Sequence, residues 1–150
     1  MFDGVYNNSE YWINGKKLGY HPSGYAPFYF DVTDYLNPNE DNRMTVRVDH
    51  SHYADSRWYT GSGIYRDVKM IVTDRLHIPV WGTFVTTPVV TDKYAKVNNQ
   101  VTVCNSYSEP RAAVVEVVYK DNKGNIAAFE VFSIKLNAGE EKIIDIVSEI

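Results

Sequence analysis

Polar and apolar residues alternate along two stretches in the first half of the chain. In residues 43–49 every second residue is apolar and the residues between them are polar. In residues 67–72 a valine or methionine occupies every second position. This period of two is typical of β-strands that bury one face and expose the other. The sequence therefore predicts a strand in each stretch.

A tight hairpin is predicted near the start of the chain. The strand-like segments Tyr11–Ile13 and Lys16–Leu18 are separated only by Asn14 and Gly15. Asn-Gly favours the type I′ turn, which joins two antiparallel strands through two residues. We therefore expect these two segments to pair with each other.

Five further strand-like segments follow Asp74, with turn-forming residues between them. Strands at this spacing are typical of a β-sandwich. Ala112–Tyr119 also has the length of a short helix, but its valines are β-branched and favour a strand. No helix longer than one turn is expected. The segments are His77–Thr86, Val97–Tyr107, Arg111–Lys120, Ile126–Leu136 and Lys142–Val147, and the turns lie at Thr87–Pro88, Glu109–Pro110, Asp121–Asn125 and Asn137–Gly139.

The chain is thus predicted to be all-β and to fold as two units. Residues 77–150 hold almost enough strands for an immunoglobulin-like sandwich. Residues 1–76 hold too few for a complete jelly roll, so we expect this unit to be the C-terminal part of one. Because Met1 comes directly before the first strand-like segment, the chain is interpreted as a piece of a larger protein.

Composition narrows the possible partners. The 150 residues carry a net charge of -4, which argues against nucleic acid as a partner. No apolar run approaches the roughly 20 residues needed to cross a bilayer, so no membrane role is expected. Cys104 is the only cysteine, so no disulfide can form within the chain. The compartment stays open between the bacterial cytoplasm and the periplasm or exterior.

Five segments, taken in order, resemble the sugar-binding domain of glycoside hydrolase family 2. The likeness is nearest to the β-galactosidase branch, with the β-glucuronidases and β-mannosidases as more distant relatives. The domain that follows in that family is immunoglobulin-like, and residues 77–150 resemble it, although with fewer motifs. The five segments are Phe2–Tyr6, Trp12–Gly19, Gly24–Tyr25 with Phe28–Thr33, Val46–Asp49 and Ser56–Val68.

The resemblance implies a galactose-binding-like jelly roll, cut short, followed by the immunoglobulin-like domain. It also implies that the two catalytic glutamates lie elsewhere, on a (β/α)₈ barrel that this chain lacks. Retaining glycosidases need two carboxyl groups about 5 Å apart. No catalytic residue is therefore assigned here, and the chain is expected to be inactive alone. The function that the resemblance implies is that of an accessory region, which belongs to a glycosidase that hydrolyses β-glycosidic bonds with retention.

The candidate binding site is the loop that precedes Gly61. The resemblance implies that this loop reaches the catalytic cleft and helps to form a sugar subsite. Arginine can donate paired hydrogen bonds to hydroxyl or carboxylate groups, and tryptophan can stack on a sugar. Equally, Trp58 can pack beneath the loop while Arg57 pairs with Asp55. The assigned substrate-binding residues are Asp55, Arg57, Trp58 and Tyr59.

Other candidate chemistry in the sequence is weaker. His50 and His52 can share one face of a strand, but no third ligand stands at a suitable spacing, so neither a metal nor a cofactor is expected. Gly61–Gly63 precedes a β-branched residue and not a helix, so it is interpreted as a sharp entry into a strand. A set of tyrosines can equally stack on sugars or belong to the core margin: Tyr20, Tyr25, Tyr29, Tyr35 and Tyr53.

Two other functions remain open, and so does association of the chain with a second copy of itself. The chain can be a free-standing carbohydrate-binding module, or a structural or adhesive β protein without a ligand. If the first sandwich is incomplete, its uncovered apolar faces and strand edges favour pairing with a second copy. We therefore expect self-association. In the intact enzyme the expected partners are the catalytic barrel and a β-galactoside or related carbohydrate.

Overall fold

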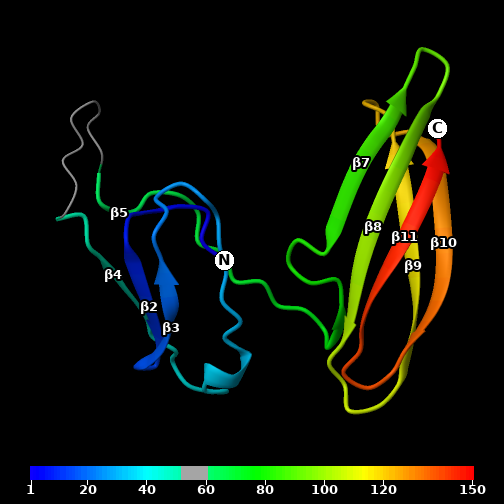
Figure 1. Ribbon diagram of the computed structural model, residues 1–150. Coiled ribbons are helices and arrows are strands. Elements are labelled where there is room, and N and C mark those ends of the chain that lie inside the picture. Colours follow the sequence, from blue (N-terminus) through cyan, green and yellow to red (C-terminus); the bar gives the residue numbers. More distant parts are fainter. Residues whose placement is uncertain (52–60) are drawn as a thin grey trace. The chain divides into compact units, whose positions relative to one another are not determined.

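The computed structural model describes residues 1–51 and 61–150 (Figure 1). The described residues form strands and one 3₁₀ turn, η1 (Thr33–Tyr35), and include no helix that could span a bilayer. The predicted all-β class is therefore confirmed. The chain divides into two compact units, Met1–Ile71 and Val72–Ile150.

The first unit contains a three-stranded antiparallel sheet. Its central strand, β2 (Ser9–Ile13), pairs with β3 (Lys16–His21) on one side and with β4 (Met44–Val48) on the other. Asn14 and Gly15 join β2 to β3 with φ angles of 51° and 79°. Two positive φ angles define the type I′ turn, so the predicted hairpin and the predicted strand in residues 43–49 are both confirmed.

A second, smaller pairing joins the two ends of the first unit. Strand β1 (Val5–Tyr6) runs antiparallel to β5 (Gly63–Ile64). The strand predicted over residues 67–72 is wrong, because only Val68 forms a bridge, with Phe2. The stretch alternates polar and apolar residues, but its apolar side chains are not packed against a sheet, and Met70 is 72% exposed.

Aromatic rings form the core of the first unit. The rings of Phe2 and Phe28 stack with centroids 5.3 Å apart, and Tyr11 lies 4.9 Å from Phe2 and 5.1 Å from Phe28. Tyr11 is fully buried and its hydroxyl donates a 2.6 Å hydrogen bond to Ser9 Oγ. Burial raises the pKa of Tyr11, and the bond to Ser9 partly opposes this rise. This cluster joins β2 to segments without regular structure.

The second unit has two antiparallel sheets built from long strands (Figure 1). In one sheet, β8 (Ala95–Asn105) pairs with β11 (Glu141–Glu149), with β7 (Thr83–Val90) and with the short β6 (Leu76–His77). In the other sheet, β9 (Arg111–Lys120) pairs with β10 (Ile126–Leu136). Residues 112–119 are therefore a strand, as their valines predicted.

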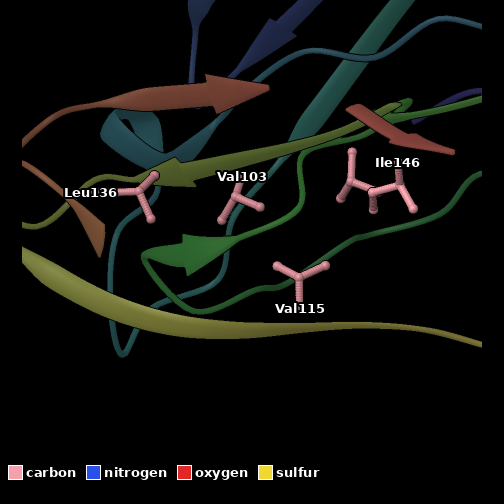
Figure 2. Close-up of a cluster of buried hydrophobic side chains, with 5 residues drawn as sticks. Val103, Val115, Leu136 and Ile146 are labelled. Atoms are coloured by element: carbon pink, nitrogen blue, oxygen red, sulfur yellow. The ribbon is translucent and has the colours of Figure 1, made fainter. Parts of the chain in front are cut away.

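Aliphatic side chains from both sheets pack together between them. Figure 2 shows Val103 and Ile146 of the larger sheet beside Val115 and Leu136 of the smaller one. All four side chains are buried, and Leu136 and Ile146 are among the largest fully buried side chains of the described chain. The second unit is therefore a β-sandwich, as the spacing of its strands predicted.

Two details of the second unit differ from the prediction. The segment His77–Thr86 is not one strand, because Trp81 has a φ of 59° and the Gly82 N–H donates to the Pro79 carbonyl oxygen, which forms a turn. Thr87–Pro88 is not a turn, because both residues lie within β7 at an irregularity in its register. Proline lacks an N–H donor, and an edge strand accepts it at such a bulge.

Candidate functional site

The four residues assigned to substrate binding, Asp55, Arg57, Trp58 and Tyr59, lie outside the described residues. The chain is described on both sides of them. Nδ1 of His50 and Oγ of Ser62 lie 2.9 Å apart and share a hydrogen bond. His50 and Ser62, which flank residues 52–60 in the sequence, are therefore neighbours in the first unit.

Aromatic rings pack at this place. The Tyr6 ring meets the His50 ring at 4.9 Å and the Tyr25 ring at 5.5 Å, both edge to face. A Cβ atom on Gly24 would lie 2.2 Å from the Tyr6 ring, so only glycine allows this approach. We call Tyr6, Gly24, Tyr25, His50 and Ser62 the loop base.

Hydrogen bonds fix the chain where it enters the loop. Both the N–H and the hydroxyl of Ser51 donate to Asp49 Oδ1, at 3.1 Å and 2.6 Å. Asn8 Nδ2 donates to the Asp49 carbonyl oxygen, and the Tyr20 hydroxyl donates to Asn8 Oδ1 at 2.8 Å. The turn between β1 and β2 therefore holds the last described residues before the loop.

Backbone geometry and hydrogen bonds also fix the chain that follows residue 60. Gly63 has a φ of 117°, a conformation that favours glycine, and it begins β5. The interpretation of Gly61–Gly63 as a sharp strand entry is confirmed. Beyond it, the Tyr65 hydroxyl donates to the Gly24 carbonyl oxygen at 2.8 Å and Arg66 Nη1 donates to the Tyr25 carbonyl oxygen at 3.3 Å.

A series of ion pairs between charged side chains runs across the three-stranded sheet to Asp49. Glu10 on β2 forms ion pairs with Lys17 (2.5 Å) and Arg47 (3.2 Å). The hydrogen bond from Lys17 and the two nearby cations lower the pKa of Glu10. Arg47 Nη2 also lies 3.6 Å from Asp49 Oδ2, at the start of the loop. This network is exposed and adds orientation more than stability.

Two tyrosine rings of the first unit, one of them in the loop base, are exposed. Tyr25 is 60% exposed and Tyr20 is 54% exposed, so part of each ring is available for stacking on a ligand. Among residues 1–51 and 61–150, no cluster of three or more acidic, histidine or cysteine side chains could hold a metal ion. His50 instead contacts Tyr6 and Ser62, while His52 lies outside the described residues.

Several members of the loop base were recognisable in the sequence, but their role at this place was not. Tyr6 and Gly24 appeared only as parts of the family segments. Tyr25 also appeared among the tyrosines that can stack on a sugar, and His50 appeared only as a weak metal candidate. Ser62 was taken as part of a glycine-rich strand entry. One signal could have found them, because a glycine followed by tyrosine outside a strand suggests a close approach to the backbone.

The first unit carries the sequence features of a carbohydrate-binding domain. Residues 1–74 match the sugar-binding domain of the glycosyl hydrolases family 2. The chain therefore belongs to glycoside hydrolase family 2.

Particular relatives support this assignment over nearly the whole chain. The β-galactosidase BoGH2A of Bacteroides ovatus is 42% identical over 142 residues, which are 95% of this chain and 17% of that protein. A β-glucuronidase of Bacteroides fragilis is 31% identical over 132 residues, which are 81% of this chain and 19% of that protein. The chain thus spans less than a fifth of the length of these two relatives.

Solved structures extend the likeness to the fold. A glycosyl hydrolase family 2 member from Bacteroides cellulosilyticus superposes with a TM-score of 0.86 at 34% identity, covering 99% of this chain and 20% of that one. The fold class is therefore confirmed as part of a jelly-roll sandwich followed by an immunoglobulin-like sandwich. The assignment of residues 1–76 and 77–150 to these two domains stays a prediction.

Proposed function

We propose that the chain is a non-catalytic accessory region of a family 2 glycosidase, and that its loop contributes to a sugar subsite. The observation that carries this proposal is the loop base. His50 and Ser62, which flank the candidate loop, share a hydrogen bond, and the His50 ring packs against the Tyr6 ring. A binding loop gains affinity when its ends are fixed in advance, because less conformational entropy is lost on binding.

The side chains assigned to the loop suit a carbohydrate. Arg57 donates paired hydrogen bonds to sugar hydroxyl groups, and Asp55 accepts from them. Trp58 and Tyr59 offer apolar ring faces for the C–H side of a pyranose. In the intact enzyme this loop reaches the subsite while the reactive carboxylates stand on the catalytic barrel.

The proposed reaction of the intact enzyme is hydrolysis of a β-glycosidic bond with retention. That reaction needs a nucleophile and an acid/base carboxyl group about 5 Å apart. Two glutamates of the second unit, Glu109 and Glu140, are engaged in local contacts instead. Glu109 pairs with Arg111 at 2.5 Å, and Glu140 accepts the Asn137 N–H at 2.5 Å. These contacts support a structural role for both side chains.

The test uses the full-length enzyme with changes in the loop. Because a hydrogen bond to a charged group contributes about 1.5–3 kcal/mol, Arg57→Ala should lower kcat/KM by roughly tenfold to a hundredfold. Trp58→Ala should act in the same direction. Lys123→Ala, in an exposed turn of the second unit, is the matched control and should leave kcat/KM unchanged. Normal kinetics in both loop variants would contradict the proposal.

Titration of the isolated chain with galactose or lactose separates this function from that of a free-standing binding module. The accessory role predicts no saturable change in tryptophan fluorescence at micromolar sugar, because the subsite needs the barrel. Saturable micromolar binding would favour the module instead.

We further propose that the isolated chain self-associates. The outer face of β9 and β10 carries exposed apolar side chains, with Phe129 at 65% and Val114 at 61% exposure. Light scattering should therefore give a mass above that of one chain. A mass of one chain with a single cooperative melt would contradict this proposal.

A further inference from the structure

A shallow hollow lies on the outer face of the larger sheet of the second unit. Six side chains surround it in two rows across β7, β8 and β11, because directly paired residues and residues two apart share one face of a sheet. The register places Phe84, Gln100 and Asp145 in one row. It places Thr86, Asn98 and Val147 in the next, and all six line the hollow.

The opposite face of the same strands is the core of the sandwich. Ile146 lies between the two rows on β11 and packs among the buried aliphatic side chains. Asn99, which occupies the same position on β8, is 8% exposed. The six residues therefore do not complete the core. Phe84 is 63% exposed and Val147 is 58% exposed, which leaves an aromatic and an aliphatic surface on the outside of the protein.

The polar groups of the hollow are partly ordered and partly unsatisfied. Gln100 Nε2 donates a 2.7 Å hydrogen bond to Asp145 Oδ1, which fixes both side chains at the centre of the sheet. Asn98 Oδ1 is buried and receives no hydrogen bond from residues 1–51 or 61–150. Buried acceptors are normally satisfied. Because this oxygen is buried, the Asn98 side chain has to turn toward the hollow before a ligand hydroxyl can donate to it.

The lining also selects the class of ligand. Among the residues that line the hollow, Asp145 carries the only charge, and none is basic. An anionic ligand is therefore repelled. An aromatic ring beside amide, hydroxyl and carboxylate groups suits a polyhydroxylated, uncharged molecule. The hollow measures about 210 Å³, which is smaller than the roughly 300–1,000 Å³ of drug-sized sites and suits one sugar ring.

We propose that this face binds one pyranose ring of a neutral oligosaccharide. Phe84 stacks on the ring, while Asn98, Gln100 and Asp145 bond to its hydroxyl groups. This goes beyond the function proposed above, because the hollow belongs to the second unit and shares no residue with the loop base. The open shape of the surface and its few polar groups predict weak, millimolar binding.

The test is an NMR titration of the 150-residue chain. The probes are two neutral tetrasaccharides, a β-1,4-galactan and a β-1,4-glucan fragment, and an acidic oligogalacturonate. Residue-specific shifts separate the hollow from the loop base, so failure at one place does not imply failure at the other. We expect the side-chain amide signals of Asn98 and Gln100 to move with a neutral probe and not with the acidic one.

Three variants sharpen the result. Phe84→Ala should weaken neutral-probe binding roughly threefold to tenfold, as expected for loss of an aromatic contact. Tyr94→Ala removes an exposed aromatic ring, 45% accessible, from the turn between β7 and β8 and should change nothing. Asp145→Asn should remove the discrimination against the acidic probe. Unchanged amide spectra with both neutral probes, or shifts confined to the loop base, would overturn the proposal.

Discussion

The two units form their cores from different kinds of side chain. In the first unit, rings such as Phe2, Tyr11 and Phe28 gather around short strands and irregular segments. In the second unit, valine, leucine and isoleucine fill the space between two sheets of long strands. The aromatic cluster needs little regular structure, because one ring contacts several others at once. The aliphatic core needs continuous alternation along each strand.

This difference explains where function is expected. Much of the first unit consists of segments that connect its short strands. These connecting segments include the candidate loop and most of the loop base. Binding residues are commonly found on loops that a rigid scaffold positions. The second unit devotes its length to strands, so its only proposed ligand surface is a sheet face.

The largest effect is expected from Phe28→Ala. Phe28 contacts the rings of Phe2, Tyr11, His21 and Phe30 and is 8% exposed. Truncating a buried phenylalanine typically costs about 3–5 kcal/mol. Hydrogen exchange should show faster exchange in β2 and little change in β8. Equal acceleration in both strands would show that the two cores do not act separately.

The corresponding change in the second unit is Leu136→Ala. Leu136 is fully buried between the two sheets, so its truncation should cost about 2–5 kcal/mol. Exchange should now accelerate in β8 and not in β2. Val114→Ala, at a position 61% exposed on β9, serves as the control and should have little effect. Similar losses of stability from Leu136→Ala and Val114→Ala would contradict the assignment of Leu136 to the core.

A smaller effect is expected from pH at the turn between β9 and β10. Hydrogen bonds from Asn125, first from its side chain and then from its backbone, lower the pKa of Asp121. The folded pKa thus lies below the unfolded value of about 3.9. The contribution of Asp121 to stability is present above that value and is lost as pH falls through the folded pKa. An NMR titration should show this low pKa, and Asn125→Ala should raise it toward the ordinary value.

Features that depend on local chemistry could be predicted from the sequence. Asn14 and Gly15 defined a hairpin because few dipeptides accept two positive φ angles. The valines of residues 112–119 defined a strand because branching at Cβ restricts the side chain. In both cases the deciding interaction lies within a few residues of the signal.

Features that depend on distant partners could not be predicted. Residues 67–72 alternate as a strand does, but no sheet face covers Met70. Trp81 and Gly82 form a turn inside an apolar run, where sequence alternation alone suggested continuity. Likewise, the bond between His50 and Ser62 joins residues on opposite sides of the loop. The four assigned loop residues themselves came only from family resemblance, and their role stays a prediction.

The central claim is that this chain positions a sugar-contacting loop while the reactive carboxylates belong to another part of the enzyme. The most direct measurement compares hydrolysis of a nitrophenyl β-galactoside by the 150-residue chain and by the full-length protein. We expect turnover by the full-length protein and none above background by the chain alone. Turnover by the isolated chain at the rate of the intact enzyme would contradict the account.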